Sequence, residues 1–211
     1  ILHQKYLYQA KFKEQKVQEL LEKFANFKGK VESIKTTKQF NYRNKVTLQV
    51  KENIGYYKKK SYDIVPIDSC FIADERINNI IKLVKTIDLN NINQIVIRVT
   101  NKESMVVFYC MDNVIIDVSK FNTVDTVVVI GNKQEILKGK GYIEEEIHNI
   151  KYVISPTSFF QVNTLGMINL YNKVLEYADL KGDENLLDLY CGTGTIGIYL
   201  SKYCGKVFGI E

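Results

Sequence analysis

A glycine-rich turn between two apolar segments limits the possible folds of this 211-residue chain more than any other feature. The pattern predicts a buried apolar strand over 185–190, a turn over 191–197, a helix over 195–203 and a second apolar strand over 206–211. A strand, loop, helix and strand in this order begin a doubly wound, nucleotide-binding sheet. The chain is therefore predicted to be α/β overall, with a Rossmann-like unit at its C-terminal end.

The turn carries the residue types expected at a site for an adenosyl cofactor. Gly192, Gly194 and Gly197 have the spacing that permits a tight turn and a close approach of the backbone to a ligand. Glu211 ends the second strand, where a carboxylate can accept hydrogen bonds from both hydroxyls of a ribose. No Gly-Lys-Ser or Gly-Lys-Thr occurs, which excludes a Walker phosphate loop.

Two cofactors fit this pattern. NAD places its pyrophosphate on the helix N-terminus, whereas S-adenosylmethionine presents an amino acid and a sulfonium. Asp188 lies within the first strand, where NAD sites usually carry an apolar residue and where a carboxylate can help to hold an ammonium group. This residue favours S-adenosylmethionine, and a fragment of an NAD-dependent oxidoreductase is the alternative. Asp188 also suits a cap on the backbone amides of the turn, which is compatible with either cofactor.

The first part of the chain shows a helical period followed by a strand period. Residues 4–27 predict one amphipathic helix, with Gly29 as its stop. Alternating apolar residues over 46–50 predict a half-buried strand, and turn residues over 52–55 lead to a returning strand over 56–65. These segments form a predicted hairpin.

A row of further strands with little helix between them predicts an α+β central domain with an antiparallel sheet. A short helix is expected over 74–87 and a longer one over 164–179. A change of character near 153–158 predicts a boundary between a central domain, 1–155, and the truncated start of a doubly wound nucleotide-binding domain, 156–211. The strands are expected over 94–100, 105–111 and 124–130, with β-like segments near 134–143 and 149–155.

Charge is distributed unevenly along the chain, whose net charge is +5. Residues 1–60 carry 15 Lys and Arg against five Asp and Glu, whereas residues 61–211 carry 14 against 19. A basic first part favours contact with a polyanion. In the predicted hairpin, basic residues are interleaved with tyrosines, a combination that suits the phosphates and unstacked bases of single-stranded RNA. The predicted RNA-binding residues are Arg43, Lys45, Lys58, Lys59 and Lys60.

Two other interpretations of this basic hairpin stay open. In the first, the segment is an ordinary exposed hairpin whose lysines are solvated. In the second, it belongs to a non-catalytic RNA-binding module. The module predicts RNA binding that weakens steeply as the salt concentration rises.

Composition excludes several other classes of protein. The chain is 45% hydrophobic and 25% charged, which is typical of a globular protein, and no apolar run is long enough for a transmembrane helix or a signal peptide. We therefore expect a cytoplasmic protein that does not bind membranes. The sequence leaves the oligomeric state open, and a monomer is the expectation. The chain lacks an initiator Met, so an upstream segment is expected to have been removed. Four widely spaced cysteines without a CxxC pair make a disulfide framework unexpected.

Three segments together resemble a known family. Leu187–Gly197 (LDLYCGTGTIG) and Ser158–Asn163 (SFFQVN) are similar to the cofactor-side motifs of the RNA uracil-5-methyltransferases, and Tyr42–Lys45 (YRNK) resembles a further segment of their central domain. The resemblance extends over essentially the whole chain. It implies S-adenosylmethionine-dependent methylation of C5 of a uridine in RNA, with ribosomal RNA favoured over transfer RNA.

The resemblance also assigns roles to individual residues. It places Gln161, Tyr190 and Thr195 at the cofactor, and it makes Glu211 the ribose-binding acid. Asn163 is expected to organise the loop around the site. With the residues of the turn, the predicted cofactor-binding set is Gln161, Asp188, Tyr190, Gly192, Gly194, Thr195 and Glu211.

The cysteines receive separate expectations. Cys70 matches the fourth ligand of a [4Fe-4S] cluster in members that carry one, so a cluster is possible in the complete protein. Cys191 belongs to the turn and is expected to be a small packed residue rather than a nucleophile. Cys110 and Cys204 match no role and are expected to pack.

The same resemblance places other parts of the family outside this chain. Its first three cluster cysteines and a small RNA-binding β-barrel would lie before Ile1, and its catalytic Cys and general-base Glu would lie beyond Glu211. C5 of uracil is a poor nucleophile, so methylation there requires a thiolate to add at C6 first. We therefore expect no catalytic residue within these 211 residues, and we expect the chain to be an inactive fragment on its own.

Overall fold

The computed structural model of the chain describes residues 4–112 and 114–211. Their contacts separate an N-terminal unit, Ile1–Gln39, from a larger unit, Phe40–Glu211. Among the described helices, none is both long and apolar enough to cross a bilayer.

The N-terminal unit contains the predicted amphipathic helix, α1 (Tyr6–Ala25). The helix ends where Asn26 takes a left-handed conformation with φ of 49°, so the predicted stop at Gly29 is wrong by three residues. Asn adopts this conformation more readily than other residues with a Cβ atom, because its short polar side chain can hydrogen-bond locally.

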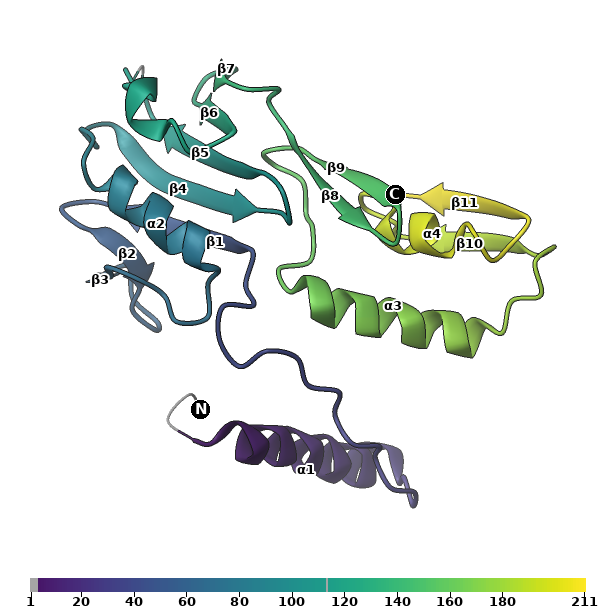
Figure 1. Cartoon of the computed structure of the whole chain (residues 1–211). Helices are drawn as coiled ribbons and strands as arrows, with labels where there is room; N and C mark the ends of the chain where they lie inside the picture. The colour runs from purple at the N-terminus through teal and green to yellow at the C-terminus, as the bar shows by residue number, and fades with distance from the viewer. Residues whose placement is uncertain (1–3, 113) are drawn as a thin grey trace. The chain divides into compact units, whose positions relative to one another are not determined.

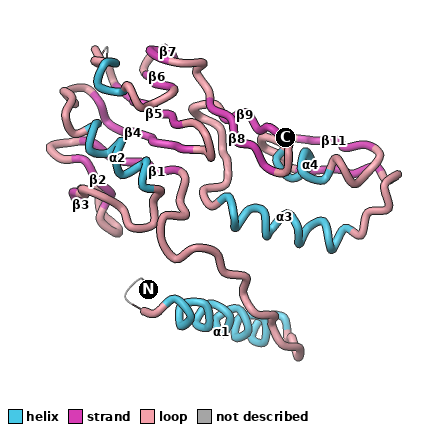
Figure 2. The backbone as a smooth tube through the Cα atoms, in the orientation of Figure 1, coloured by secondary structure: helices cyan, strands magenta, loops and turns pink. Residues whose placement is uncertain are grey.

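Residues 26–39 form neither helix nor strand and lie along α1 (Figure 2). Three side chains of the helix, Tyr6, Glu14 and Gln18, hold them through hydrogen bonds. The Gln18 side chain accepts a hydrogen bond from the Val31 amide at 2.7 Å, and the Tyr6 hydroxyl donates to the Thr37 carbonyl at 3.0 Å.

A sheet of seven strands forms the larger part of the second unit. Its strands are β1 (Lys45–Val50), β2 (Ile54–Tyr57), β3 (Ile64–Pro66), β4 (Ile92–Val99), β5 (Ser104–Cys110), β6 (Thr126–Ile130) and β7 (Gln134–Lys138). Their order across the sheet is β3-β2-β1-β4-β5-β6-β7 (Figure 1). The strands predicted over 46–50, 94–100, 105–111 and 124–130 are thus present, with small shifts at their ends.

The sheet is mixed, which corrects the prediction of an antiparallel one. Neighbouring strands are antiparallel except β5 and β6, which run parallel with Met105 opposite Thr126. β5 ends at Cys110 and β6 begins at Thr126, which leaves enough chain for the crossover that a parallel pair requires. The connection contains a short 3-10 helix, Val118–Phe121, and its sequence has no clear helical period that would predict it.

The predicted returning strand over 56–65 is also wrong, because it is two short strands with a turn between them. Tyr57 of β2 lies opposite Ile64 of β3. Within the turn, the Lys58 amide donates to the Asp63 carbonyl at 2.8 Å, and Lys60 has a φ of 60°. The polar run that begins at Lys58 offers no apolar side chain to a sheet face, so the chain turns there.

Helix α2 (Glu75–Val84) covers one face of the sheet. Asp74 begins the helix, because its carboxylate accepts a hydrogen bond from the Arg76 amide at 2.9 Å. The apolar side of α2 and the facing residues of the sheet form the first core. Its members from α2, β1 and β4 are Ile77, Ile80, Ile81, Val84, Val46, Leu48, Ile95 and Ile97.

The opposite face of the sheet packs against the hairpin of β8 (Ile143–Ile147) and β9 (Ile150–Ile154) and against α3 (Thr164–Ala178). This second core joins Val96 and Met105 of the sheet to aromatic residues of β9, α3 and the segment between them. It contains residues from both sides of the boundary expected near 155, which stays a prediction.

The predicted strand, turn, helix and strand are confirmed at the C-terminal end. β10 (Asn185–Leu189) and β11 (Lys206–Ile210) are parallel neighbours, joined through α4 (Thr195–Leu200). The expectation that 185–190 is buried is wrong, because the residues on one face of β10, Leu186 and Asp188, are only half-buried. α4 covers that face, whereas Leu187 and Leu189 on the other are 55% and 56% exposed.

Candidate cofactor site

The turn between β10 and α4 has the backbone geometry that its glycines predict. Gly192 and Gly194 have φ of 56° and 71°, a region that residues with a Cβ atom avoid. Tyr190 also has a positive φ, 59°, and its side chain is 91% exposed. Such conformations in non-glycine residues concentrate at ligand sites. The same short segment therefore carries an exposed aromatic ring and a glycine backbone that a ligand can approach closely.

Two carboxylates bind the backbone of this turn. Glu211 Oε2 accepts a hydrogen bond from the Gly192 amide at 2.7 Å, and Asp188 Oδ2 accepts one from the Gly197 amide at 2.9 Å. Asp188 thus makes the amide cap that was the alternative to an ammonium contact. A Cβ atom on Gly197 would lie 3.0 Å from Asp188 Oδ2, so the third glycine is what lets the carboxylate approach.

The segment that contains Gln161 lies beside this turn. The Thr193 hydroxyl donates to the Phe159 carbonyl at 3.3 Å. The Asn163 side chain begins α3 by accepting a hydrogen bond from the Gly166 amide at 3.0 Å. Gln161 itself is half-buried. The structure therefore places the two cofactor-side motifs in direct contact.

Asn44 connects the sheet to the same segment, and the sequence reasoning missed it. Its side-chain Nδ2 donates to the Gln161 carbonyl and to the Thr164 hydroxyl, both at 3.1 Å, and its amide donates to the Val162 carbonyl at 2.8 Å. The partners are more than 110 positions apart, so no local pattern predicts them. The one available signal was that Asn44 falls within the Tyr42–Lys45 segment.

An aromatic cluster supports the turn from behind. Tyr171 of α3 is buried, and its hydroxyl donates to Thr195 Oγ1 at 2.7 Å. Its ring meets the ring of Tyr199 edge-on at 5.3 Å. Burial raises the pKa of Tyr171, so this hydroxyl stays protonated and remains a donor. Sequence reasoning missed Tyr171 as a site residue, although its position four residues after Met167 predicts a buried helix face.

A small cavity lies between α4 and the β10–β11 pair. Its volume is about 260 Å³, and its lining residues are Asp188, Cys191, Gly194, Gly197, Ile198, Ser201, Val207 and Gly209. Sites that enclose a drug-sized ligand are typically about 300–1,000 Å³. Of the predicted cofactor-binding residues, Asp188 and Gly194 line this cavity, which is smaller than such sites.

Cys70 lies apart from these residues, after β3. Its amide donates to the Asn78 side chain at 2.8 Å, and Asn78 donates back to the Cys70 carbonyl at 3.3 Å. Burial, together with a hydrogen bond to the Cys70 thiol, raises the pKa of Tyr56. Within the part of the chain that the structure describes, no three or more His, Cys, Asp and Glu residues are placed to hold a metal ion. One thiol alone cannot hold a four-iron cluster, which needs four ligands, so the role of Cys70 as the fourth ligand in the complete protein stays a prediction.

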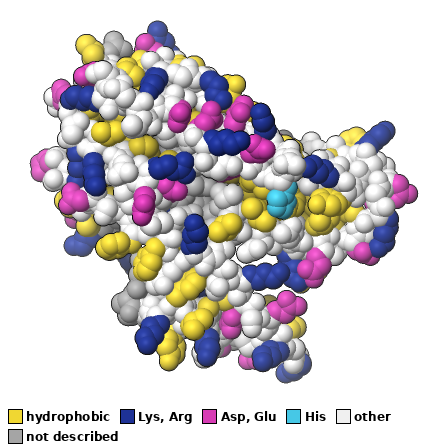
Figure 3. Space-filling model, in the orientation of Figure 1, with side chains coloured by type: hydrophobic (Ala, Val, Ile, Leu, Met, Phe, Trp, Pro, Cys, Tyr) yellow, Lys and Arg dark blue, Asp and Glu magenta, His cyan; other side chains and the backbone are white. Residues whose placement is uncertain are grey.

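The predicted RNA-binding residues lie at one end of the sheet. Arg43 and Lys45 stand at the start of β1 and are half-buried. Gln49 lies opposite Gly55 in the antiparallel β1–β2 pair, so the exposed turn after β2, which carries Lys58, Lys59 and Lys60, reaches the same end. The Tyr57 and Tyr62 rings beside this turn meet edge-on at 5.6 Å. Over the sheet as drawn in Figure 3, basic and acidic side chains are otherwise interspersed.

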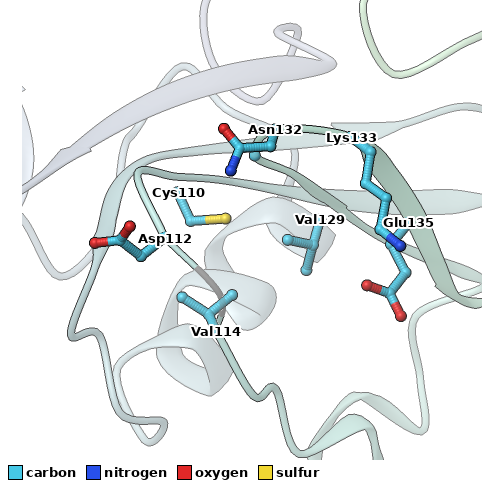
Figure 4. Close-up of a pocket in the computed structure, with 8 residues that line it drawn as sticks. Cys110, Asp112, Val114, Val129, Asn132, Lys133 and Glu135 are labelled. Carbon is cyan, nitrogen blue, oxygen red and sulfur yellow. The ribbon is translucent and has the colours of Figure 1, made fainter.

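A larger cavity, of about 560 Å³, lies at the C-terminal ends of the parallel strands β5 and β6 (Figure 4). The Cys110 thiol points into it, whereas the Asp112 carboxylate points away. Burial, with a smaller contribution from the charge of Asp112, raises the pKa of Cys110. A thiol kept protonated is a poor nucleophile and a poor metal ligand. The expectation that Cys110 packs therefore stands as a prediction consistent with this geometry.

Comparison with known proteins gives a family match. A family model described as tRNA (Uracil-5-)-methyltransferase matches residues 6–211. A relative from Clostridium tetani, described as an uncharacterized RNA methyltransferase, is 35% identical over 248 residues, which cover 99% of this chain and 54% of the relative. A relative of the same description from Clostridium acetobutylicum is 33% identical over 255 residues, covering 99% of this chain and 55% of the relative.

A solved structure is similar throughout the chain. It is the crystal structure of the Pyrococcus abyssi tRNA (uracil-54, C5)-methyltransferase in complex with S-adenosyl-L-homocysteine. The TM-score is 0.83 at 30% identity, and the match covers 98% of this chain and 57% of that one. The chain thus spans about half the length of the curated relatives that it matches.

Proposed function

Because the chain belongs to the tRNA (uracil-5-)-methyltransferase family, we propose that the complete protein methylates C5 of a uridine in RNA with S-adenosylmethionine. The observation that carries this proposal is the joined pair of motifs, in which Glu211 bonds to Gly192 and Thr193 bonds to Phe159. The donor set suits an adenosyl cofactor, because a carboxylate at the end of β11 faces a turn of exposed backbone. S-adenosylmethionine supplies the methyl group when it is bound.

The residues of this chain bind and orient in the proposed reaction. Glu211 accepts hydrogen bonds from the ribose, and Gln161 and Thr195 contact the rest of the cofactor. Asp188 keeps the turn in shape through its bond to Gly197. In the proposal these 211 residues contribute no nucleophile, and the chain alone is inactive.

The basic end of the sheet is the proposed RNA contact. Arg43, Lys45 and the Lys58–Lys60 turn would neutralise phosphates, and the exposed Tyr62 ring offers a base a stacking surface. A target base must leave its stack to reach the pocket, so contacts that hold the flanking backbone are required. The same observations favour a second candidate, an RNA-binding module without catalysis.

The test uses the complete protein and S-adenosylmethionine labelled in its methyl group. The substrates are unmodified ribosomal RNA and unmodified transfer RNA, in separate reactions. We expect label at C5 of a uridine in one of them, and that result identifies the substrate class. Label in neither RNA, with RNA binding retained, would favour the non-catalytic module.

Two matched changes separate the two parts of the proposal. Glu211→Ala is expected to weaken S-adenosylhomocysteine binding and leave RNA affinity unchanged. Replacement of Lys58, Lys59 and Lys60 by Gln is expected to weaken RNA binding and leave cofactor affinity unchanged. Protection of the protein against heat by NAD, and not by S-adenosylmethionine, would contradict the cofactor assignment.

A further inference from the structure

A buried, unpaired arginine lies in the sheet close to the proposed site. Arg98 of β4 is 2% exposed, and its two terminal guanidinium nitrogens are shielded from solvent and have no hydrogen-bond partner among the described residues. Burial lowers its pKa to about 10, so the side chain still carries its charge at neutral pH. A buried charge without a partner costs several kcal/mol. An anion bound to Arg98 would therefore remove this cost.

The charges around Arg98 are also positive. Lys45 of β1 lies directly opposite Arg98 in the antiparallel pair, so the two side chains share one face of the sheet. Burial, followed by the charges of Arg98 and Arg43, lowers the pKa of Lys45. Among the described residues, the only titratable group that favours the charged form of Arg98 is Tyr109, which is not a carboxylate. Three cations therefore lie together, and among the described residues Arg98 has no ion pair with a carboxylate.

The location of these cations connects them to the candidate site. Asn44, between Arg43 and Lys45, holds the Gln161 carbonyl through its side chain. Val96, next but one to Arg98 and on the same face of β4, packs in the core cluster that contains Phe160. The cationic group thus faces the segment that carries the cofactor-side motif.

We propose that Arg98, together with Lys45 and Arg43, forms a binding site for a phosphate of the RNA backbone next to the target uridine. This inference rests on the proposed function. A guanidinium presents paired N–H donors that match two phosphate oxygens, and one phosphate would compensate the buried charge. Because the Arg98 nitrogens are shielded, the proposal requires a neighbouring side chain, such as the flexible Lys45, to move aside when the phosphate enters.

The test measures stability and RNA binding of the full chain with Arg98→Met. An apolar side chain of similar length removes an uncompensated buried charge, so we expect a melting temperature equal to or above that of the parent. For a uridine-containing single-stranded RNA, we expect the Kd to rise at least about ten-fold and the slope of log K against log salt to fall by about one. Arg98→Lys should keep the salt slope and lose part of the affinity, because it keeps the charge and loses the fork of donors.

Arg76→Met is the matched control. Arg76 is an arginine already paired with Asp74, with Nε and Oδ1 3.1 Å apart, so we expect neither the Kd nor the salt slope to change. If Arg98→Met lowers the melting temperature and leaves both RNA quantities at the parent values, Arg98 is a structural cation and the inference is overturned. If inorganic phosphate raises the melting temperature of the parent but not of Arg98→Met, while RNA affinity is equal, the source is free phosphate and the RNA assignment is wrong. Failure of the parent chain to bind RNA at all would instead overturn the RNA part of the proposed function.

Discussion

The hydroxyl of Tyr171 provides a direct test of how the turn is supported. Tyr171→Phe removes the oxygen that donates to Thr195 Oγ1 at 2.7 Å and keeps the ring that packs against Tyr199. The side chain is 1% exposed, so water does not replace the lost oxygen from the ring side. The change therefore isolates one hydrogen bond between α3 and the first turn of α4.

The expected magnitude follows from that single bond. A neutral intramolecular hydrogen bond contributes about 0.5–1.5 kcal/mol net. For a chain of this size, about 1 kcal/mol corresponds to a fall in melting temperature of roughly 2–4 °C. If Thr195 contacts the cofactor and the same free energy is lost there, the Kd for S-adenosylhomocysteine rises about five-fold. Thermal unfolding of this chain measures the first quantity, and calorimetric titration of the complete protein with S-adenosylhomocysteine measures the second.

Tyr199→Phe is the matched control in the same aromatic cluster. The Tyr199 hydroxyl donates to Asn172 Oδ1 at 2.7 Å and lies 3.1 Å from His148 Nδ1, and it has no hydrogen bond to the glycine turn. Tyr199→Phe should therefore lower the melting temperature at least as much as Tyr171→Phe does, and it should leave the Kd for S-adenosylhomocysteine unchanged.

Two results would refute the reasoning about Tyr171. If Tyr199→Phe raises the Kd as much as Tyr171→Phe does, the effect is a general loosening of the cluster. If Tyr171→Phe and Thr195→Val have additive effects on stability, the two hydroxyls are not coupled.

Three further changes have definite expected signs. The Tyr152 hydroxyl is shielded from solvent and has no hydrogen-bond partner in the described chain. Tyr152→Phe should therefore raise the free energy of unfolding, measured in urea, by on the order of 1 kcal/mol, and a lower free energy of unfolding would contradict this. A Cβ atom at Gly197 would lie 2.9 Å from Val207 Cγ1, so Gly197→Ala should cost about 1–3 kcal/mol and weaken cofactor binding, and wild-type values for both would contradict the packing. Burial raises the pKa of Glu145 above its ordinary 4.5, so the folded state binds its proton more tightly and stability falls as pH rises from 4.5 through the folded pKa. Glu145→Gln, which keeps an acceptor for the Asn101 amide, should remove that part of the pH dependence of the unfolding free energy, and an unchanged profile would assign it to another group.

The parts of the fold that depend on neighbours in sequence could be predicted. The strand, turn, helix and strand over 185–210 are each specified by a local period and by glycines at fixed spacing, and all four are present. The parallel pairing of β5 and β6 could not be predicted, because it depends on a crossover whose residues show no helical period. The half-exposed face of β10 was missed for a related reason. The sequence of an apolar strand shows that its side chains are hydrophobic, but it does not show which element covers each face of the strand.

The candidate site divides along the same line. Gly192, Gly194 and Glu211 are found from spacing, because the turn imposes that spacing. Asn44 is 117 positions from Gln161, and this contact exists only once the sheet and the cofactor segment have folded together. Arg98 shows the same limit, because alternation in β4 places it on the face opposite Ile95 and Ile97 but does not show that this face is buried.

The turn is held in shape by the chain itself. Two carboxylates already bond to its amides, Glu211 to Gly192 and Asp188 to Gly197, and Thr193 ties it to Phe159. A carboxylate has about four acceptor positions, so Glu211 can accept a hydrogen bond from a ribose hydroxyl without releasing Gly192. A ligand that binds here therefore does not need to order the turn, and less of its binding free energy is lost to ordering. In the proposed function Glu211 both shapes the loop and recognises the ribose, whereas Asp188 shapes the loop, and the two acids lie directly after β11 and within β10.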